Sequence, residues 1–183
     1  MLKDILNQRR ATRSLAPVAI TPQIITDLAE SAQLMPSCFN KQPWRFVFVS
    51  AKDQLTNLHQ SLNKGNEWAQ KASLIVAVFT KKDLDCVVKG REYFLFDTGM
   101  ATAALILRAT EMGLVAHPIA GYDEEKVREV LNIPDEFQVI TLINIGKKSA
   151  EIDPILNDNQ KAAEKERPAR LAFRDFAYLS KFN

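Results

Sequence analysis

The sequence of 183 residues predicts one α+β domain in which helices flank a central β-sheet. Two observations support this fold class. The run 74–79 is apolar and largely β-branched without alternation, as expected for a strand covered on both faces. The stretch between Glu92 and Arg108 carries one charge, Asp97, and several small residues, which predicts a buried central helix. No repeat or second core is evident, so we expect a single domain over 1–183.

The first part of the chain is predicted to be helical. Residues 2–10 read as a short helix with its apolar side chains on one side. Thr21 followed by Pro22 is a strong helix start, because threonine caps the first turn and proline is preset for the first helical position. Apolar residues then recur at helical spacing until Pro36, where a polar loop begins.

Strands and helices follow one another through the middle of the chain. Apolar runs predict strands at 46–49, 74–79, 115–119 and 139–145. Helices are predicted at 55–62 and in the stretch that starts near Glu92 and is ended by Gly113. An acidic first turn predicts a third helix from Asp123 through Leu131.

The last segment, 147–183, is predicted to be a C-terminal extension. Residues 147–166 are polar and loop-like, whereas the residues after them include four aromatic side chains. An aromatic segment separated from the core needs a surface to cover. It either folds back on its own core or packs on a partner subunit, and the second alternative suits a homodimer.

The composition excludes several functional classes. A formal net charge of +2 is too small for nucleic-acid binding to be the main activity. The most apolar stretch, 93–107, is shorter than the roughly 20 residues of a membrane span. Cys38 and Cys86 make no disulfide framework, and the N-terminus lacks an apolar signal core. We therefore expect a soluble cytoplasmic protein that binds neither nucleic acid nor membranes.

Common catalytic and metal motifs are absent from the sequence. Neither GxGxxG, GxxxxGK[ST] nor GxSxG occurs, and His59 and His117 are too far apart for a local metal motif. Cys38 has no nearby histidine to activate it, so an inert loop cysteine is favoured. Asp97 is a buried acid–base group, a helix-surface carboxylate or a structural hydrogen-bond partner. If the protein is an enzyme, a cofactor supplies the difficult chemistry.

Two arginine-rich segments are candidate anion sites. Arg9, Arg10 and Arg13 follow a short helix, and three guanidinium groups in five residues can contact a phosphate from more than one direction. Lys165 and Arg167, with Arg170 close behind, make a second basic cluster. A solvated patch and a helix-flanking charge cluster explain these residues equally well.

The loop 36–44 is a candidate for recognising a heterocycle. Two prolines limit its freedom, and between them it presents Ser37, Asn40 and Gln42. Amide groups offer donors and acceptors that match the alternating edge of a flavin pyrimidine ring. Taken alone, a polar turn that leads into a strand is the simpler account.

Together, these segments resemble the FMN-dependent nitroreductase family over roughly residues 5–170. The segment 9–13 resembles an RRSxR-like phosphate motif, with Ala11 in place of the serine. The segment 36–44, PSCFNKQPW, resembles a PSxxNxQPW-like loop and is the most specific match. The stretch 97–114 is similar to a DxGxA…GL central helix, and the pair at 165 and 167 is similar to a basic pair that closes on the phosphate.

This resemblance implies the fold and the site. The fold would be nitroreductase-like, with a central mixed β-sheet, a buried central helix and an intertwined homodimer that holds FMN at its interface. The phosphate and ribityl region of FMN would be bound by Arg9, Arg10 and Arg13, with Ala11 in the same cofactor-binding segment and with Lys165 and Arg167 joining them. Whether Arg170 rather than Arg167 meets the phosphate is left open. Loop residues Ser37, Asn40 and Gln42 would contact FMN from the other subunit. The backbone at Ala120 and Gly121 would lie near the isoalloxazine ring, with an amide facing flavin N5.

The resemblance also implies the activity. NAD(P)H would pass a hydride to flavin N5, and a nitroaromatic, a quinone or a similar acceptor would be reduced in a ping-pong cycle, with no catalytic side chain and no metal. Whether NADH or NADPH is preferred is left open. The alternatives are a flavin-binding or flavin-sensing protein without this turnover, and reduced-flavin chemistry such as dehalogenation or flavin breakdown.

Overall fold

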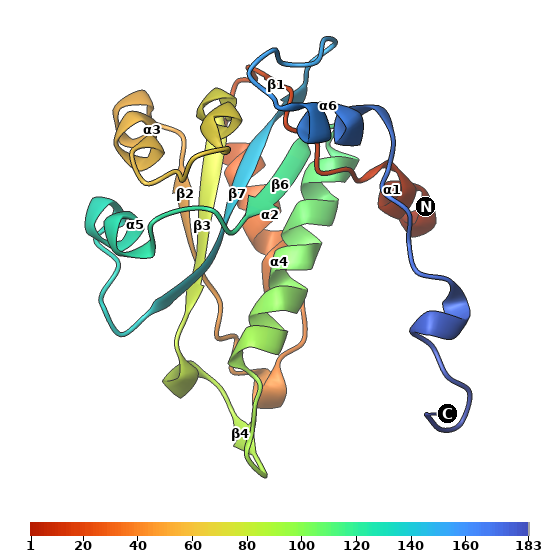
Figure 1. Cartoon of the computed structure of the whole chain (residues 1–183). Helices are drawn as coiled ribbons and strands as arrows, with labels where there is room; N and C mark the ends of the chain where they lie inside the picture. The colour runs from red at the N-terminus through yellow and green to blue at the C-terminus, as the bar shows by residue number, and fades with distance from the viewer. Residues whose placement is uncertain (183) are drawn as a thin grey trace.

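The computed structural model describes residues 1–182 and places a five-stranded sheet between two layers of helices (Figure 1). Strand β7 (Gln138–Lys148) lies in the middle of the sheet. On one side it pairs with β3 (Leu74–Thr80), which pairs with β2 (Arg45–Val49). On its other side β7 pairs with β6 (Val115–Ile119), and the C-terminal end of β7 also pairs with the short β1 (Leu15–Ala16).

Every strand pair of this sheet is antiparallel in the described residues, so the expectation of a mixed sheet is wrong for this part of the chain. The connection between β2 and β3 shows the physical reason. Val49 at the end of β2 pairs with Ile75 near the start of β3, so the chain leaves and re-enters the sheet at the same end. A parallel neighbour would require a crossover to the opposite end.

Strand β3 is covered on both faces, as its unbroken apolar run predicts. Leu74, Val76 and Val78 pack in one cluster, with α2 (Pro22–Gln33) and α4 (Phe94–Glu111). Ile75 and Ala77 pack in the other, with α3 (Lys52–His59) and α5 (Glu124–Leu131). The alternation follows from the two-residue period of a strand.

Helix α4 is buried on one face only. Asp97, Ala101 and Leu105 are buried against the sheet and α2. Leu95 and Phe96, on the opposite side, are 46% and 63% exposed. The prediction of a helix packed closely against its neighbours is therefore confirmed for one face, while the other face is apolar and uncovered in a single chain.

The remaining predicted helices form with the expected caps. Helix α1 spans Leu2–Gln8, and the hydroxyl of Thr21 accepts a hydrogen bond from the Ile24 N–H at the start of α2. Asp123 caps α5 in the same way. Helix α3 begins at Lys52, three residues before the predicted start at Leu55. The first turn is polar, so the apolar pattern becomes visible only from Leu55 onward. The two short strands β4 (Val87–Val88) and β5 (Arg91–Glu92) form a separate hairpin.

The segment 147–166 differs from the predicted loop. It contains helix α6 (Asp158–Lys165), which starts with a capping box between Asn157 and Gln160. The helix has no apolar stripe, which is why its period is not visible in the sequence. Its stabilisation comes from the cap and from contacts of its last turn with the N-terminal segment, described below.

The residues after α6 leave the body of the molecule as a tail (Figure 1). The tail includes Leu171, Phe173, Phe176 and Leu179, each more than 60% exposed. The described part of the tail therefore does not fold back on the core of its own chain. Among the described residues, no helix has the length and apolar character needed to cross a membrane.

Candidate functional site

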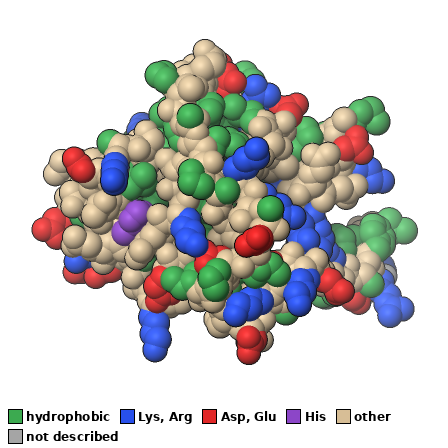
Figure 2. Space-filling view, turned by 90° about the horizontal axis from the view of Figure 1, so that it is seen from above, with side chains coloured by type: hydrophobic (Ala, Val, Ile, Leu, Met, Phe, Trp, Pro, Cys, Tyr) green, Lys and Arg blue, Asp and Glu red, His purple; other side chains and the backbone are tan. Residues whose placement is uncertain are grey.

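Arginines from the two ends of the chain line one pocket of about 170 Å³. One wall is the segment after α1, and the other is the segment at and after the end of α6. Figure 2 shows Lys and Arg side chains gathered where the tail leaves the body. The residues that line the pocket are Arg9, Arg10, Ala11, Arg13, Ala163, Arg167, Pro168 and Arg170.

The positive charge of this pocket is not neutralised. Within residues 1–182, none of Arg9, Arg13, Arg167 and Arg170 forms an ion pair with a carboxylate. Partial burial lowers the pKa of Arg9, and the charges of Arg167 and Arg170 lower it further. Like charges held this close favour an anionic ligand, and guanidinium groups match the geometry of a phosphate.

Arg10 has a different position from the other arginines. Its guanidinium donates hydrogen bonds to the carbonyl oxygens of Ala163 at 2.7 Å and Glu164 at 3.2 Å. These carbonyls belong to the last turn of α6, where cations stabilise a helix end. Arg10 therefore fastens α6 to the N-terminal segment, and it reaches the pocket as part of the wall.

The second basic cluster is divided by the structure. Arg167 donates to the carbonyl oxygens of Asn7 at 2.6 Å and Arg9 at 2.7 Å, so it joins the two walls of the pocket. Arg170 also lines the pocket. Lys165 is exposed and is not among the lining residues. The sequence left open whether Arg167 or Arg170 meets the phosphate, and both arginines line the pocket.

Three buried side chains, which the sequence did not single out as site residues, hold the N-terminal wall. Glu164 accepts hydrogen bonds from the backbone N–H groups of Arg13 and Ser14. Trp68 lies between the Arg13 guanidinium, 5.8 Å from its ring, and the His117 ring, 4.6 Å away. Spacing in sequence gives no signal for these residues, because each acts through a contact between distant segments.

His117 is a structural residue of this wall. Its Nδ1 lies 3.0 Å from the carbonyl oxygen of Thr12, which can only accept, so Nδ1 carries the hydrogen and donates. Burial lowers the pKa of His117 to about 4, with a smaller contribution from the charge of Arg13. The imidazole is therefore neutral at physiological pH.

The loop that contains Ser37, Asn40 and Gln42 is tightly constrained. The Ser37 hydroxyl accepts a hydrogen bond from the Gln42 N–H at 2.9 Å, and the Gln42 amide donates to the Asn40 side chain at 3.1 Å. Phe39, Asn40 and Gln42 have φ values of 47°, 56° and 50°. Left-handed backbone at three residues other than glycine is costly and is typical of functional loops.

Asp97 supports this loop from the start of α4. Its carboxylate accepts a hydrogen bond from the Cys38 N–H at 2.6 Å, and its side chain is almost fully buried. Of the three roles that the sequence left open, burial excludes the helix-surface carboxylate, and the structural hydrogen-bond partner is the one observed.

The third predicted segment lies at the end of β6. Ala120 is exposed directly after the strand. The Gly121 carbonyl accepts hydrogen bonds from the Asn63 N–H at 3.1 Å and the Asn66 side chain at 2.9 Å. A Cβ at Gly121 would displace the Asn66 amide from this position, so glycine leaves room for the hydrogen bond between them.

The segments after α1 and at the end of α6, which line the arginine pocket, lie near one end of α4, and the loop 36–44 (the amide loop) lies near its other end (Figure 1). The loop contacts Asp97 in the first turn of α4. Arg10 and Thr12 share a second pocket with Thr110 and Gly113 at the other end of the helix. Thirteen residues of helix rise by about 20 Å, so the two groups lie far apart within a single chain.

The fold is thus an α+β domain whose arginine pocket has the charge and geometry to suit a phosphorylated or similarly anionic ligand. The model of the nitroreductase family matches residues 6–147, and the chain belongs to this family of flavin-dependent oxidoreductases.

Individual relatives agree with the family assignment. MhqN of Bacillus subtilis (strain 168), whose name assigns it provisionally as an NAD(P)H nitroreductase, is 29% identical over 80% of this chain and 88% of its own length. A crystal structure described as an oxidoreductase containing FMN superimposes with a TM-score of 0.83 at 28% identity, covering 98% of this chain and 91% of that one. A protein from Exiguobacterium sibiricum 255-15 in complex with FMN gives 0.80 at 23% identity, covering 98% and 97%.

Proposed function

We propose that this protein is an FMN-dependent oxidoreductase that carries a hydride from NAD(P)H to a small acceptor such as a nitroaromatic or a quinone, in a ping-pong cycle. The observation that carries the proposal is the pocket of Arg9, Arg13, Arg167 and Arg170, which has no anionic partner in the described residues. Bound FMN supplies the hydride chemistry at its N5. The residues of the chain bind and orient it.

The phosphate of FMN belongs in the arginine pocket. Arg9 and Arg13 approach it from the N-terminal segment, and Arg167 and Arg170 approach it from the segment after α6. Guanidinium groups from two directions fix both the position and the rotation of a phosphate. Ala11 takes the place of the serine of the family motif and has no hydroxyl group. At this position only the backbone is therefore available to the phosphate.

A homodimer brings the other half of the site to this pocket. Ser37, Asn40 and Gln42 lie at the far end of α4 from the arginines of their own chain, so they suit the FMN of a second chain. The uncovered apolar face of α4, which includes Leu95 and Phe96, gives such a dimer its interface. The exposed aromatic tail, 173–182, adds further surface for a partner.

The polar loop and the end of β6 supply orientation and electrostatics. The amides of Asn40 and Gln42 would supply hydrogen-bond donors to the pyrimidine edge of bound FMN, where donors stabilise negative charge on the reduced ring. The backbone at Ala120 and Gly121 would help to position the isoalloxazine and would offer a backbone N–H to it. No side chain has to transfer a proton in this scheme, which fits a site without a catalytic pair.

The test is the visible spectrum of the freshly purified protein, followed by titration with NADH and with NADPH. A yellow protein that bleaches with a nucleotide and recovers colour with a quinone or a nitroaromatic supports the proposal. A yellow protein that does not bleach identifies flavin binding without this turnover. A protein that stays colourless after incubation with FMN refutes the cofactor assignment.

A further inference from the structure

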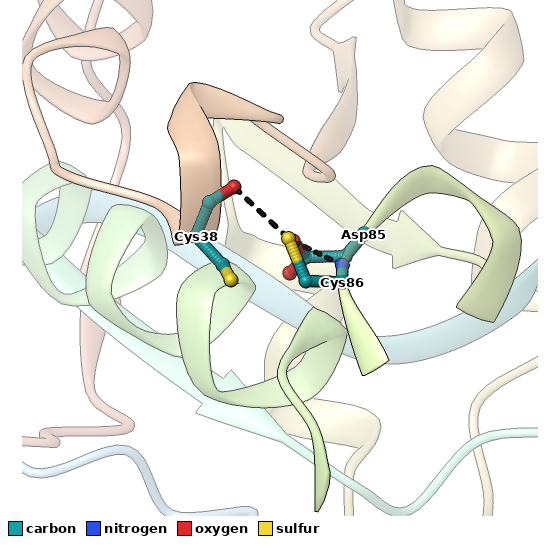
Figure 3. Close-up of side chains that lie close together, drawn as sticks. All are labelled: Cys38, Asp85 and Cys86. Carbon is teal, nitrogen blue, oxygen red and sulfur yellow. Dashed lines mark hydrogen bonds between the residues drawn. The ribbon is translucent and has the colours of Figure 1, made fainter. Parts of the chain in front are cut away.

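Two thiols and a carboxylate converge between the amide loop and the turn after β3 (Figure 3). The Sγ atoms of Cys38 and Cys86 and a carboxylate oxygen of Asp85 all lie within 4.8 Å of one another. Cys38 begins the short 3₁₀ helix Cys38–Asn40, whereas Asp85 and Cys86 follow the 3₁₀ helix Lys82–Leu84. The Cys86 thiol donates a hydrogen bond to the Cys38 carbonyl oxygen at 3.4 Å, which holds the two segments together.

The surroundings of this cluster are acidic and lack a compensating cation. The buried carboxylate of Asp97 lies beside Asp85, and one oxygen of Asp85 is buried without a hydrogen-bond partner. In residues 1–182, no Lys or Arg pairs with either carboxylate, because Lys81 and Lys82 pair with Glu136 and Glu92 instead. Asp85 is partly buried, and a buried carboxylate oxygen without a cation or a hydrogen-bond donor is costly, so the cluster favours a positively charged ligand.

We propose that Cys38, Asp85 and Cys86 form a binding site for a thiophilic divalent cation such as Zn²⁺. Two thiolates and one carboxylate oxygen are ligands that zinc accepts in a tetrahedral site, and water completes the fourth position. Tetrahedral ligands at zinc bond lengths are about 3.7 Å apart, so the three donors need to approach one another by at most about 1 Å. On binding, both thiol protons leave to the solvent and the Cys86 side chain rotates away from the Cys38 carbonyl.

A disulfide between the same cysteines explains less of the structure. It would use the two thiols and leave the paired carboxylates of Asp85 and Asp97 without a counter-charge. A cation uses the thiols and compensates the carboxylates together. Bound there, it would link the strained loop at 37–42 to the turn at 82–86. The inference concerns metal binding alone, so it stands or falls independently of the flavin proposal.

Zinc titration of the full-length protein tests the site. The protein is reduced with a phosphine, stripped of metal with EDTA, exchanged into buffer and titrated with Zn²⁺ against a chromophoric chelator. We expect one Zn²⁺ per chain, and an affinity at least about tenfold lower in Cys86→Ser and in Asp85→Asn. Asp83→Asn is the matched control, because Asp83 is an exposed carboxylate of the same turn outside the cluster.

Co²⁺ provides a second readout that does not depend on affinity. Thiolate coordination gives an intense near-ultraviolet charge-transfer band, which we expect in the unaltered protein and in Asp83→Asn but not in Cys38→Ser or Cys86→Ser. Far-ultraviolet circular dichroism checks that each variant is folded, and Asp85→Asn keeps the test valid if a serine variant is not.

Three outcomes would overturn the proposal. One is Zn²⁺ affinity that is equal in the unaltered protein, Cys86→Ser and Asp85→Asn, which would mean adventitious binding elsewhere. Another is the absence of stoichiometric binding by the reduced protein. The last is the finding of a disulfide pair. In that case the protein purified without reductant holds no metal, its two thiols become reactive only after reduction, and the reduced protein still binds no Zn²⁺.

Discussion

The Glu164 carboxylate accepts a hydrogen bond of 2.7 Å from the backbone N–H of Arg13, across 151 residues of the chain. A second hydrogen bond, of 3.2 Å, comes from the N–H of Ser14. Glu164 is buried, and hydrogen bonds to a buried carboxylate are stronger than those to an exposed one. This clamp fixes the distance between the arginines that precede β1 and those that follow α6.

Replacing Glu164 with alanine is expected to loosen the arginine pocket. Two charge-assisted hydrogen bonds are lost, each worth about 1.5–3 kcal/mol, so the free energy of unfolding should fall by about 3–6 kcal/mol. FMN affinity should fall as well, because the two walls are no longer held in register. Urea unfolding and quenching of FMN fluorescence measure the two effects. Glu166→Ala, an exposed neighbour, is the control; equal FMN affinity in both variants would contradict the role of the clamp.

Arg9→Ala and Arg13→Ala are each expected to weaken FMN binding by about 1.5–3 kcal/mol, the value of a lost charge-assisted contact. The loss should shrink at high salt, because part of the attraction is screened. Arg91→Ala removes an exposed arginine from the distant hairpin and should leave FMN affinity unchanged. Unaltered binding in both pocket variants would place the phosphate elsewhere.

The pH dependence of stability should report the buried His117. Its pKa is about 4 in the folded protein, whereas an unfolded histidine titrates near 6.5. Below pH 6.5 the unfolded state binds a proton that the folded state excludes. Stability contributed by neutral His117 is therefore complete above pH 6.5 and is lost as the pH falls toward 4, by about 3 kcal/mol in total.

Urea unfolding between pH 7.5 and pH 4.5 measures this loss. His117→Gln removes the titrating group and keeps a donor for the Thr12 carbonyl, so its stability should fall less over the same range. A pH profile identical to that of the unaltered protein would show that other groups control the acid sensitivity.

Phe96→Asp tests the uncovered face of α4. Phe96 is 63% exposed in one chain, so a charge there costs little in a monomer. In the proposed dimer, the carboxylate would be buried in an apolar interface, and the dimer should dissociate. Sedimentation velocity measures the mass, and Glu129→Lys on the exposed side of α5 is the control. An intact Phe96→Asp dimer would exclude this face as the interface.

The regular elements were predictable because their signals are local. Thr21 and Pro22 mark the start of α2, and the apolar run of β3 reflects burial on both faces. Helix α6 was missed because it has no apolar stripe, and its buried residue, Glu164, is stabilised by backbone groups near the other end of the chain. The antiparallel arrangement was also not predictable, since strand direction depends on where each connection re-enters the sheet.

The sequence by itself determined the α+β class, the order of the elements and the presence of three arginines near the N-terminus. Only the tertiary structure decided their roles. The Arg10 guanidinium donates hydrogen bonds to backbone carbonyls of α6. Arg9 and Arg13 line a pocket with Arg167 and Arg170 and form no ion pair with a carboxylate in the described residues. It also brought Cys38 next to Cys86 and separated the amide loop from the arginine pocket. The physical reason is that secondary structure follows from neighbouring residues, whereas charge compensation and ligand geometry depend on contacts between segments far apart in the chain.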